Sequence, residues 1–325
     1  VPGAEGPGVH SFWTLDQAKG VIRDLRPGSR VAMVGAGFIA FTILDALLKL
    51  GVKLTLIEVM PRILPRMVDE TCAGIVEAWL VRHGVEVRTG ARLAAIEPAN
   101  GGRRLRFQGH EDLQGDLVIM ATGIRPNLEW LEGSGVEVRA GVVVDDHLRS
   151  SAPGVYAAGD VAEGRDLVTG GLAVHAIEPT AMQHGRVAGA NMAGADVSYE
   201  GSLLMNIVGV QGLEVASFGA WDDPAAESAA AVRPERPAYR KLLWKGDRLT
   251  GAITLGRADE VWTTNDVGML KGLVQSGVGL GEWKEHLRRD PFDIKRAFVA
   301  SRTTARLLPK TVLGRPSVPA DRVLP

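Results

Sequence analysis

A short glycine turn and one acidic residue have the types and the spacing that a phosphorylated ligand requires. The turn reads GAGFIA over residues 35–40, and Glu58 follows 23 positions after Gly35. In such a turn Gly35 permits the tight bend, Gly37 lets the backbone approach a pyrophosphate, and Ala40 allows a helix to pack closely on a sheet. The N–H groups and the positive dipole at the start of that helix stabilise phosphates. The pattern therefore predicts a dinucleotide site.

The carboxylate of Glu58 distinguishes between two dinucleotides. It can accept hydrogen bonds from both hydroxyls of the adenosine ribose of NAD, whereas the 2′-phosphate of NADP would meet a like charge. Arg62 is close by in the sequence and moderates this preference. NAD is the expected ligand, and a tight turn without a ligand is the alternative. The turn residues expected to contact the cofactor are Gly35, Gly37, Phe38 and Ile39.

The turn needs a strand before it and a helix after it, and the sequence predicts both. Upstream, Thr14 and Gln17 have the spacing of a capping box, which predicts a helix start. Strands that alternate with helices indicate βαβ units around a parallel sheet. The elements expected around the turn are a strand over 30–34, a helix over about 38–50, a strand over 53–59, a helix over about 67–83 and further strands up to residue 122.

Two more units are expected after this sheet, so the chain is predicted to be α/β with a final α+β domain. Pro179 is expected to open a helix, because proline at a first helical position loses no hydrogen bond. The elements expected in the second unit are strands over 141–150 and 154–160 and a helix over 179–194. Those expected from about residue 200 are β-rich runs, a polar loop over 222–237, a hairpin turn at 245–247 and helices near 259–276 and 281–305.

Composition excludes several classes of protein. The net charge is −1 with 23% charged residues, so the chain as a whole does not have the charge of a nucleic-acid binder. Cys72 is the single cysteine, which excludes an intrachain disulfide and a metal site of clustered thiolates; it is interpreted as a small buried helix residue. The apolar run over 31–44 is too short and too broken to span a membrane, and a cytoplasmic location is expected.

Two further motifs make a family resemblance specific. They are ATGIRPN at 121–127 and GVYAAGDVAEG at 154–164, in order after the glycine turn. With these motifs, roughly residues 1–200 of the chain resemble the FAD- and NAD(P)-dependent pyridine nucleotide-disulfide oxidoreductase superfamily. Within this superfamily the chain resembles the branch of the NADH-dependent rubredoxin, ferredoxin and nitrite reductases and the NADH oxidases.

The resemblance implies a role for each motif. Gly35, Gly37 and Glu58 would hold NADH, and the nicotinamide half would pass Thr122 and Gly123. The start of the helix after Pro179 would point at the flavin pyrimidine edge, where a helix dipole stabilises developing negative charge. Asp160 would bind the ribityl chain of FAD. The FAD-binding residues implied are Gly159, Asp160, Thr180 and Ala181, and no catalytic side chain or metal ligand is assigned.

The resemblance also implies a domain plan. A Rossmann-like NAD-binding domain (28–147) is inserted in an FAD-binding domain, of which 1–27 is a connecting segment and 148–199 the second half. An α+β interface domain (200–325) follows, which in relatives makes dimers. By this comparison roughly a hundred residues of the first FAD half, with its own glycine turn, are not in this chain. Three explanations are open: a fragment of a longer gene product, a separate subunit, or loss of FAD.

The function expected is that of an NADH-dependent FAD oxidoreductase, or the larger part of one. Hydride would pass from NADH to the flavin and electrons would then go to an acceptor. The alternative is a non-catalytic NAD-binding or assembly subunit that has lost FAD. Thr42 supports the alternative, because many relatives have Glu there. A disulfide reductase is disfavoured, because the last domain has only His286 and no His-Pro pair.

The C-terminal segment carries a charge excess that suggests a partner. From 283 to 325 the sequence has ten Lys and Arg and four Asp and Glu, a net charge of +6. Such a surface fits a small acidic electron-transfer protein, for example an iron–sulfur protein. A solvated helix face and tail is the alternative interpretation.

Overall fold

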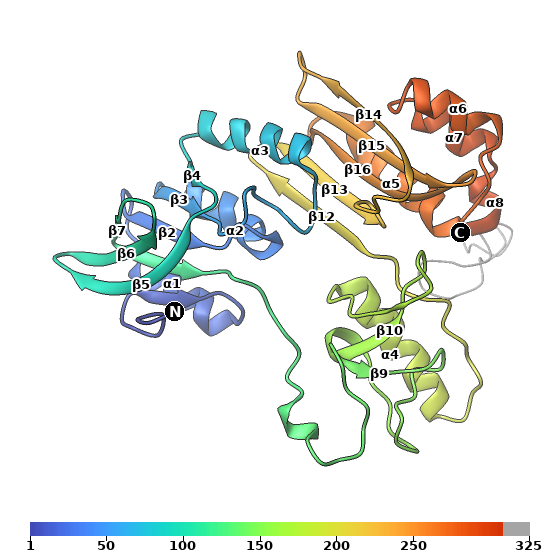
Figure 1. The fold of residues 1–325 in the computed structure, drawn as a ribbon, viewed down its shortest axis with the longest axis horizontal. Coiled ribbons are helices and arrows are strands. Elements are labelled where there is room, and N and C mark those ends of the chain that lie inside the picture. The colour runs from blue at the N-terminus through green and yellow to red at the C-terminus, as the bar shows by residue number, and fades with distance from the viewer. Residues whose placement is uncertain (308–325) are drawn as a thin grey trace, which may run out of the picture.

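The computed structural model describes residues 1–307 and shows three units along the chain (Figure 1). The first unit holds the glycine turn, the second contains the Gly159-Asp160 motif, and the last contains an antiparallel sheet with helices on one side. The predicted last domain and its basic segment continue beyond residue 307, and that part lies outside the described residues.

A five-stranded parallel sheet forms the centre of the first unit. Its strand order is β1-β8-β2-β3-β4, and every neighbouring pair is parallel, as the βαβ pattern predicts. The strands are β1 (Val9–Ser11), β8 (Leu117–Met120), β2 (Arg30–Val34), β3 (Lys53–Ile57) and β4 (Glu86–Arg88). The connecting helices are α1 (Leu15–Asp24), α2 (Phe38–Lys49) and α3 (Glu70–Arg82). A small antiparallel sheet of β5 (Arg92–Ala99), β6 (Gly102–Gln108) and β7 (Leu113–Gly115) is appended.

The helix boundaries follow local capping chemistry. Thr14 accepts from the backbone of Gln17, and the Gln17 side chain accepts from the backbone of Thr14, so the predicted capping box at α1 is confirmed. The helix predicted over about 67–83 is α3, and it begins at Glu70 rather than near residue 67. Asp69 caps it by accepting a hydrogen bond from the Cys72 N–H.

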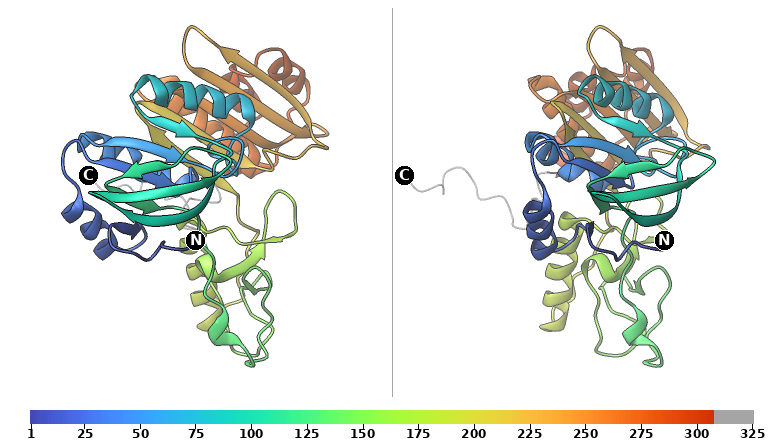
Figure 2. Two further views of the ribbon diagram at one scale, coloured as in Figure 1. Left: turned by 60° about the vertical axis from the view of Figure 1, so that its left-hand side comes forward. Right: turned by 90° about the vertical axis from the view of Figure 1, so that its left-hand side faces the viewer.

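The second unit is small and has little regular structure. Its elements are η1 (Glu129–Leu131), β9 (Val142–Val143), η2 (Gly159–Val161), β10 (Ala162–Arg165), β11 (Leu172–Ala173) and α4 (Glu178–Met192). Figure 2 shows it projecting away from the other two units in both views.

Three predictions for the second unit are wrong in detail. Of the expected strand over 141–150 only β9 forms, because Val142 and Val143 alone pair with β10. The expected strand over 154–160 is absent: a strand needs a hydrogen-bonded neighbour, and there only Tyr156 pairs, through a single bridge to Arg149. Gly159, with φ of +75°, then ends the extended run and starts η2. Helix α4 begins one residue before Pro179, which occupies its second position.

The last unit is built on a five-stranded antiparallel sheet in the order β12-β13-β16-β15-β14. Its strands are β12 (Met205–Val210), β13 (Leu213–Gly219), β14 (Glu227–Arg233), β15 (Ala238–Lys245) and β16 (Arg248–Arg257). The turn between β15 and β16 contains Gly246 with φ of +62°, which confirms the predicted hairpin. Its helices are α5 (Val261–Ser276), α6 (Glu282–Arg289), α7 (Ile294–Ala300) and α8 (Thr303–Leu307).

Two further predictions are corrected in this unit. The polar segment 222–237 is not all loop, because β14 pairs with β15 from Glu227 to Arg233; this tertiary pairing overrides the Ala- and Pro-rich composition. The helical stretch predicted over 281–305 consists of three helices. Pro291 lies between α6 and α7, and Arg302, with φ of +53°, lies between α7 and α8.

The antiparallel sheet has two buried faces, and one of them joins the first unit. Side chains such as Val215 and Leu255 share a core with α2, α3 and the parallel sheet, while Phe218 and Trp244 pack on the other face against α5 to α7. Polar contacts reinforce the junction. The Asp45 carboxylate on α2 accepts from the backbone N–H of Gln211 at 2.9 Å. The first and last units therefore form one packed body.

A candidate dinucleotide site

A cavity of about 770 Å³ lies at the carboxyl ends of the parallel strands β1, β2, β3 and β8. Ligands of open α/β sheets bind at this edge, where strand connections diverge to opposite sides. Seven of the predicted cofactor residues line the cavity together: Gly35, Gly37, Phe38, Ile39, Glu58, Thr122 and Gly123. The structure thus assembles one site from residues that are 88 positions apart at the extremes, 35 and 123.

Glycine is favoured at the two positions of the turn for different structural reasons. Gly35 has φ of +101°, and a Cβ there would collide with the Ala121 carbonyl oxygen at the end of β8. A Cβ at Gly37 would meet no protein atom within 4 Å, so its bare backbone borders open space at the cavity. Gly37 is also the N-cap of α2 and provides no side-chain cap, which leaves the first N–H groups of the helix for a ligand.

Glu58 is fixed at the end of β3. It is only 7% exposed, and its two carboxylate oxygens accept from the backbone N–H groups of Ala36 and Met60, each at 2.9 Å. A carboxylate oxygen carries two lone pairs, so each oxygen can accept a second hydrogen bond, from a ribose hydroxyl. The residue both stabilises the glycine turn and lines the cavity.

The arginine nearest in sequence is not the one that faces the ligand space. Arg62 donates to the carbonyl oxygens of Val68 and Pro65, both at 3.2 Å, and is thereby held in its own loop. Arg66 and Arg92, both exposed, line the cavity instead. Sequence spacing missed them because the loop after β3 and the start of β5 meet only in the tertiary structure.

The opposite end of the cavity is formed after β8 and β1. Gly123 has φ of +110°, which turns the chain away from the sheet directly after Thr122. Ile124 follows Gly123 directly, Trp13 follows β1 by two residues, and both line the cavity; Asn206 on β12 also lines it. The sequence had given no signal for Trp13, because its position depends on the pairing of β1 with β8.

Thr42 lies one turn into α2 and does not line the cavity. Its hydroxyl donates to the carbonyl oxygen of Ile39 at 2.7 Å, a local bond that side chains of this type often make in helices. The position at which the family resemblance leads us to expect a glutamate is thus occupied here by a short, locally bonded hydroxyl.

The four remaining predicted residues form a separate group in the second unit. Gly159, with positive φ, packs against Ala181 so closely that a Cβ would come within 3.2 Å of the Ala181 methyl. Thr180 is buried in the first turn of α4, and Asp160 is exposed. The N-terminus of α4 has no side-chain cap. These residues do not line the 770 Å³ cavity.

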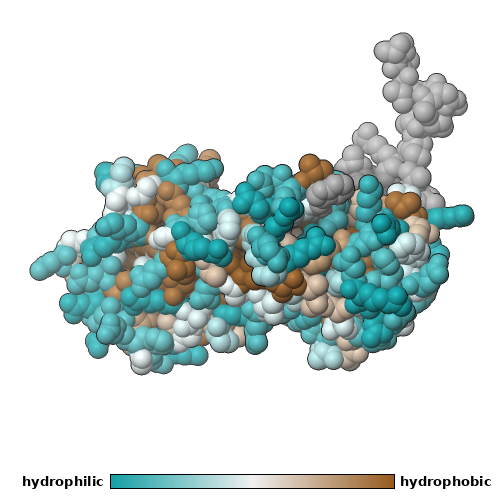
Figure 3. Space-filling view, turned by 90° about the horizontal axis from the view of Figure 1, so that it is seen from above, coloured by the Kyte–Doolittle hydropathy of each residue, from teal (hydrophilic) through white to brown (hydrophobic). Residues whose placement is uncertain are grey.

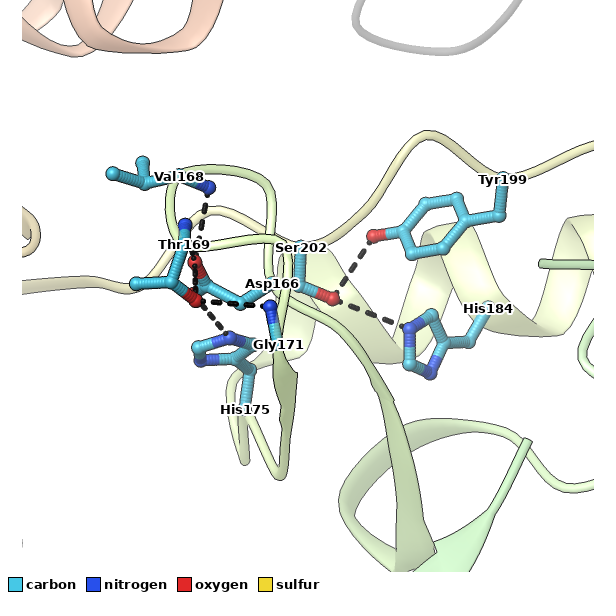
Figure 4. Close-up of polar contacts among 8 residues, drawn as sticks. All are labelled: Asp166, Val168, Thr169, Gly171, His175, His184, Tyr199 and Ser202. Carbon is cyan, nitrogen blue, oxygen red and sulfur yellow. Dashed lines mark hydrogen bonds and ion pairs between the residues drawn. The ribbon is translucent and has the colours of Figure 1, made fainter. Parts of the chain in front are cut away.

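A chain of hydrogen bonds links the Gly159 turn to α4, and Figure 4 shows the part of it that runs from His184 through Ser202 to Tyr199. The Gly159 N–H donates to His184 Nδ1 at 3.3 Å, and His184 Nε2 lies 3.2 Å from the Ser202 hydroxyl. Ser202 bonds Tyr199 at 3.1 Å. Since Nδ1 accepts, Nε2 carries the proton of a neutral ring. Burial, and then the nearby His175, lower the pKa of His184 to about 4.

The neighbouring His175 is also buried, with its Nε2 2.9 Å from the Asp166 carboxylate. The other oxygen of Asp166 accepts from the backbone of Val168 and from the backbone and hydroxyl of Thr169. Burial would raise the pKa of Asp166, but the hydrogen bonds from His175 and Thr169 outweigh it and lower this pKa. Both histidines thus have packing and structural roles in the fold.

Other candidate groups carry no site. Cys72 is buried in α3, and burial raises the pKa of its thiol, so the prediction of a buried helix residue is confirmed. His286 on α6 is paired with Asp293 at 2.7 Å. Within residues 1–307 no group of three or more His, Cys, Asp and Glu has the arrangement of a metal site.

The surface adds one further observation. In the described part of the chain, no helix combines the length and apolarity that crossing a membrane requires. On the face drawn in Figure 3, hydrophobic side chains gather in several groups surrounded by hydrophilic ones.

The sequence model of the pyridine nucleotide-disulphide oxidoreductase family matches residues 1–185, which is more than half of the chain. The chain therefore belongs to this family, as the three motifs indicate.

Individual relatives agree with this membership. The chain is 29% identical over 262 residues to the nitrite reductase [NAD(P)H] of Bacillus subtilis (strain 168), covering 80% of this chain and 32% of the relative. It is 30% identical over 255 residues to the NADH-dependent phenylglyoxylate dehydrogenase subunit epsilon of Aromatoleum evansii, covering 77% and 60%. The chain thus spans about a third of the first relative and less than two thirds of the second.

Among solved structures, the NAD-dependent persulfide reductase from A. fulgidus superposes with a TM-score of 0.81 and 27% sequence identity. The match covers 95% of this chain and 61% of that one. The arrangement of the units is therefore shared over nearly the whole chain.

Proposed function

We propose that the chain is the NADH-binding and larger part of an NADH-dependent FAD oxidoreductase. Hydride would pass from NADH to the flavin, and electrons would then go to an acceptor. The observation that carries this proposal is the junction of Glu58 with the glycine turn: a buried carboxylate, an open Gly37 and an uncapped helix start meet in one cavity.

The same geometry supports NADH over NADPH. In the proposed site an adenosine 2′-phosphate would lie beside the Glu58 carboxylate, and like charges repel in a buried site. Arg62 cannot compensate, because its guanidinium is bound to the carbonyl oxygens of its own loop. Arg66 and Arg92 line the cavity and are exposed, so their positive charges would weaken the preference for NADH over NADPH.

The second unit supports binding of FAD. An exposed Asp160, a glycine turn held against α4 and an uncapped helix N-terminus are the donors and acceptors such a group needs. We assign FAD contacts to Gly159, Asp160, Thr180 and Ala181 on this basis. When bound, FAD supplies the two-electron acceptor for the hydride. Residues 28–147 are the proposed NAD domain, 148–199 the second FAD half, and a further half-domain completes it from the same gene product or another subunit.

Partners and location are part of the same proposal. The last unit is the proposed dimer interface, and a small acidic electron-transfer protein is the proposed partner of its basic segment. Ion pairs already neutralise part of this segment: Lys284 pairs with Glu227 at 2.8 Å and Arg296 with Asp293 at 3.4 Å. Arg289, Arg302 and Arg306 stay exposed. A cytoplasmic location fits NADH as the reductant.

The test is calorimetric titration of the chain with NADH and NADPH, followed by anaerobic addition of FAD and NADH with flavin absorbance as the readout. NADH binding that is at least about tenfold tighter than NADPH binding supports the site assignment. Absence of binding by either dinucleotide would reject the proposal.

One observation favours a second candidate, a non-catalytic NAD-binding or assembly subunit. Thr42 gives α2 no carboxylate at the position many relatives use, and its hydroxyl is bound locally. This candidate predicts NADH binding without flavin reduction, even when free FAD and candidate partner proteins are supplied. Flavin reduction by NADH would eliminate it.

A further inference from the structure

The strand order shows which way a bound dinucleotide runs. Glu58, at the end of β3, marks the adenosine end, and Gly37, at the end of β2, marks the pyrophosphate. Strands β8 and β1 lie on the other side of β2 from β3. The nicotinamide half of the ligand therefore extends over the carboxyl ends of β8 and β1.

Trp13 lies at that end of the cavity on a rigid support. It follows β1 by two residues and lines the cavity together with Gly123 and Ile124. Its backbone N–H donates to the Gln17 side chain at 2.7 Å, the same side chain that closes the capping box of α1. The side chain thus projects from the fixed start of a helix rather than from a free loop.

The indole of Trp13 has room for a ligand. It is 60% exposed, and within residues 1–307 it has neither a hydrogen bond nor an aromatic partner. A hydrophobic residue before an N-cap usually packs on the fourth helical residue, but here that residue is Ala18, whose methyl covers little of an indole. A flat apolar surface at a cavity mouth gains free energy when a ring covers it.

We propose that Trp13 stacks on the nicotinamide ring and positions it at the end of β8. This inference rests on the proposed dinucleotide-binding function. The oxidised nicotinamide is a flat cation, and tryptophan is the side chain that binds such a ring most strongly through its face. Trp13 is a positioning and affinity residue for the nicotinamide half alone, since the adenosine half lies at Glu58 across the sheet.

A second exposed tryptophan provides a matched control. Trp130, in η1, is 73% exposed, and its Nε1 donates to the Asn127 carbonyl oxygen at 3.0 Å. It does not line the cavity. Its replacement removes the same side chain, an indole, without touching the ligand space.

The experiment is calorimetric titration of the 325-residue chain with NAD⁺ and with ADP-ribose, which lacks the nicotinamide. Trp13→Ala should weaken NAD⁺ binding roughly tenfold and leave ADP-ribose binding within about twofold. Trp13→Phe should retain most of the affinity, because a flat ring remains. Trp130→Ala should bind both ligands like the wild type.

Tryptophan fluorescence gives a second readout that does not depend on the alanine variant folding. NAD⁺, an electron acceptor, should quench a fraction of the emission that ADP-ribose leaves unchanged, and Trp13→Phe should abolish this difference. Equal weakening of both ligands, or no weakening of either, would overturn the stacking role while the proposed function stands. Binding of neither ligand by the wild type would overturn both.

Discussion

The two groups of predicted cofactor residues differ in how completely they are built. The dinucleotide cavity draws on the ends of four strands, and its acidic residue is buried and doubly hydrogen-bonded. The Gly159 group lies on a unit whose strands are two to four residues long, and its acidic residue, Asp160, is exposed. A complete parallel sheet converges several strand ends on one ligand, whereas the second unit presents a single turn and a single helix.

The packing of the two regions differs in the same sense. The parallel sheet shares its core with the antiparallel sheet of the last unit, while the second unit has a separate core of its own. The first region is therefore expected to bind its ligand unaided, and the second is expected to depend on a partner half-domain.

The strongest test of the first region is the turn itself. Gly35→Ala should abolish measurable NAD⁺ binding and lower the free energy of unfolding by about 3 kcal/mol, because φ is +101° and the Cβ would strike the Ala121 carbonyl. Gly37→Ala is the matched variant. It should unfold within about 1 kcal/mol of the wild type yet lose NAD⁺ affinity, because the methyl enters open ligand space. Equal stability of both variants would contradict this assignment.

The second test concerns Glu58. In Glu58→Gln an amide N–H₂ must face one of two backbone N–H donors, so the unfolding free energy should fall by about 1–3 kcal/mol. The ratio of NADH to NADPH affinity should also fall, by about tenfold, because the like charge is removed. Urea denaturation and titration with both dinucleotides measure these effects. Arg62→Ala, which leaves the ligand space unchanged, should keep the ratio.

Acid should weaken the second region selectively. The folded-state pKa of His184, about 4, lies below its ordinary value of 6.5, so the unfolded chain binds more protons as pH falls through this range. Stability that is complete above pH 6.5 is then lost progressively down to pH 4, by about 2 kcal/mol at pH 5. The measurement is urea denaturation at pH 7 and pH 5. His184→Phe should remove this part of the difference, and an unchanged difference would show that His184 is not its source.

The smallest effect is expected at Thr42. Thr42→Ala removes one exposed hydroxyl that bonds only to the Ile39 carbonyl, so stability should change by less than about 0.5 kcal/mol and NAD⁺ affinity by less than about twofold. A large loss of NAD⁺ affinity would show that this hydroxyl contacts the ligand after all. The expected result would place the residue outside the dinucleotide site.

Much of the first region was predictable, because its signals are local in sequence. The strand–turn–helix spacing around Gly35 and the acid at Glu58 follow from backbone geometry and hydrogen bonding within about two dozen residues. The capping box of α1 and the hairpin at Gly246 are local in the same way, and both are confirmed. The assignment of individual cofactor contacts stays a prediction.

The corrections fall where strand pairing decides the structure. Strand β14 exists because β15 pairs with it, although its alanines have little strand propensity. The run at 154–160 lacks such a partner and is not a strand, although its composition favours one. In both places the presence or absence of a neighbouring strand overrode local preference.

By itself, then, the sequence determined the family, the parallel sheet and the place of the glycine turn with its acid, since spacing along one chain is enough for these. Only the tertiary structure decided which side chains share the cavity. Trp13 and Arg66 reach it because the parallel sheet brings their strand ends to one edge. Arg62, nearer to Glu58 in sequence, is turned away because two loop carbonyls bind it. Proximity in sequence identified candidate residues for the site, whereas hydrogen bonding and the strand order of the sheet determined which residues line the cavity.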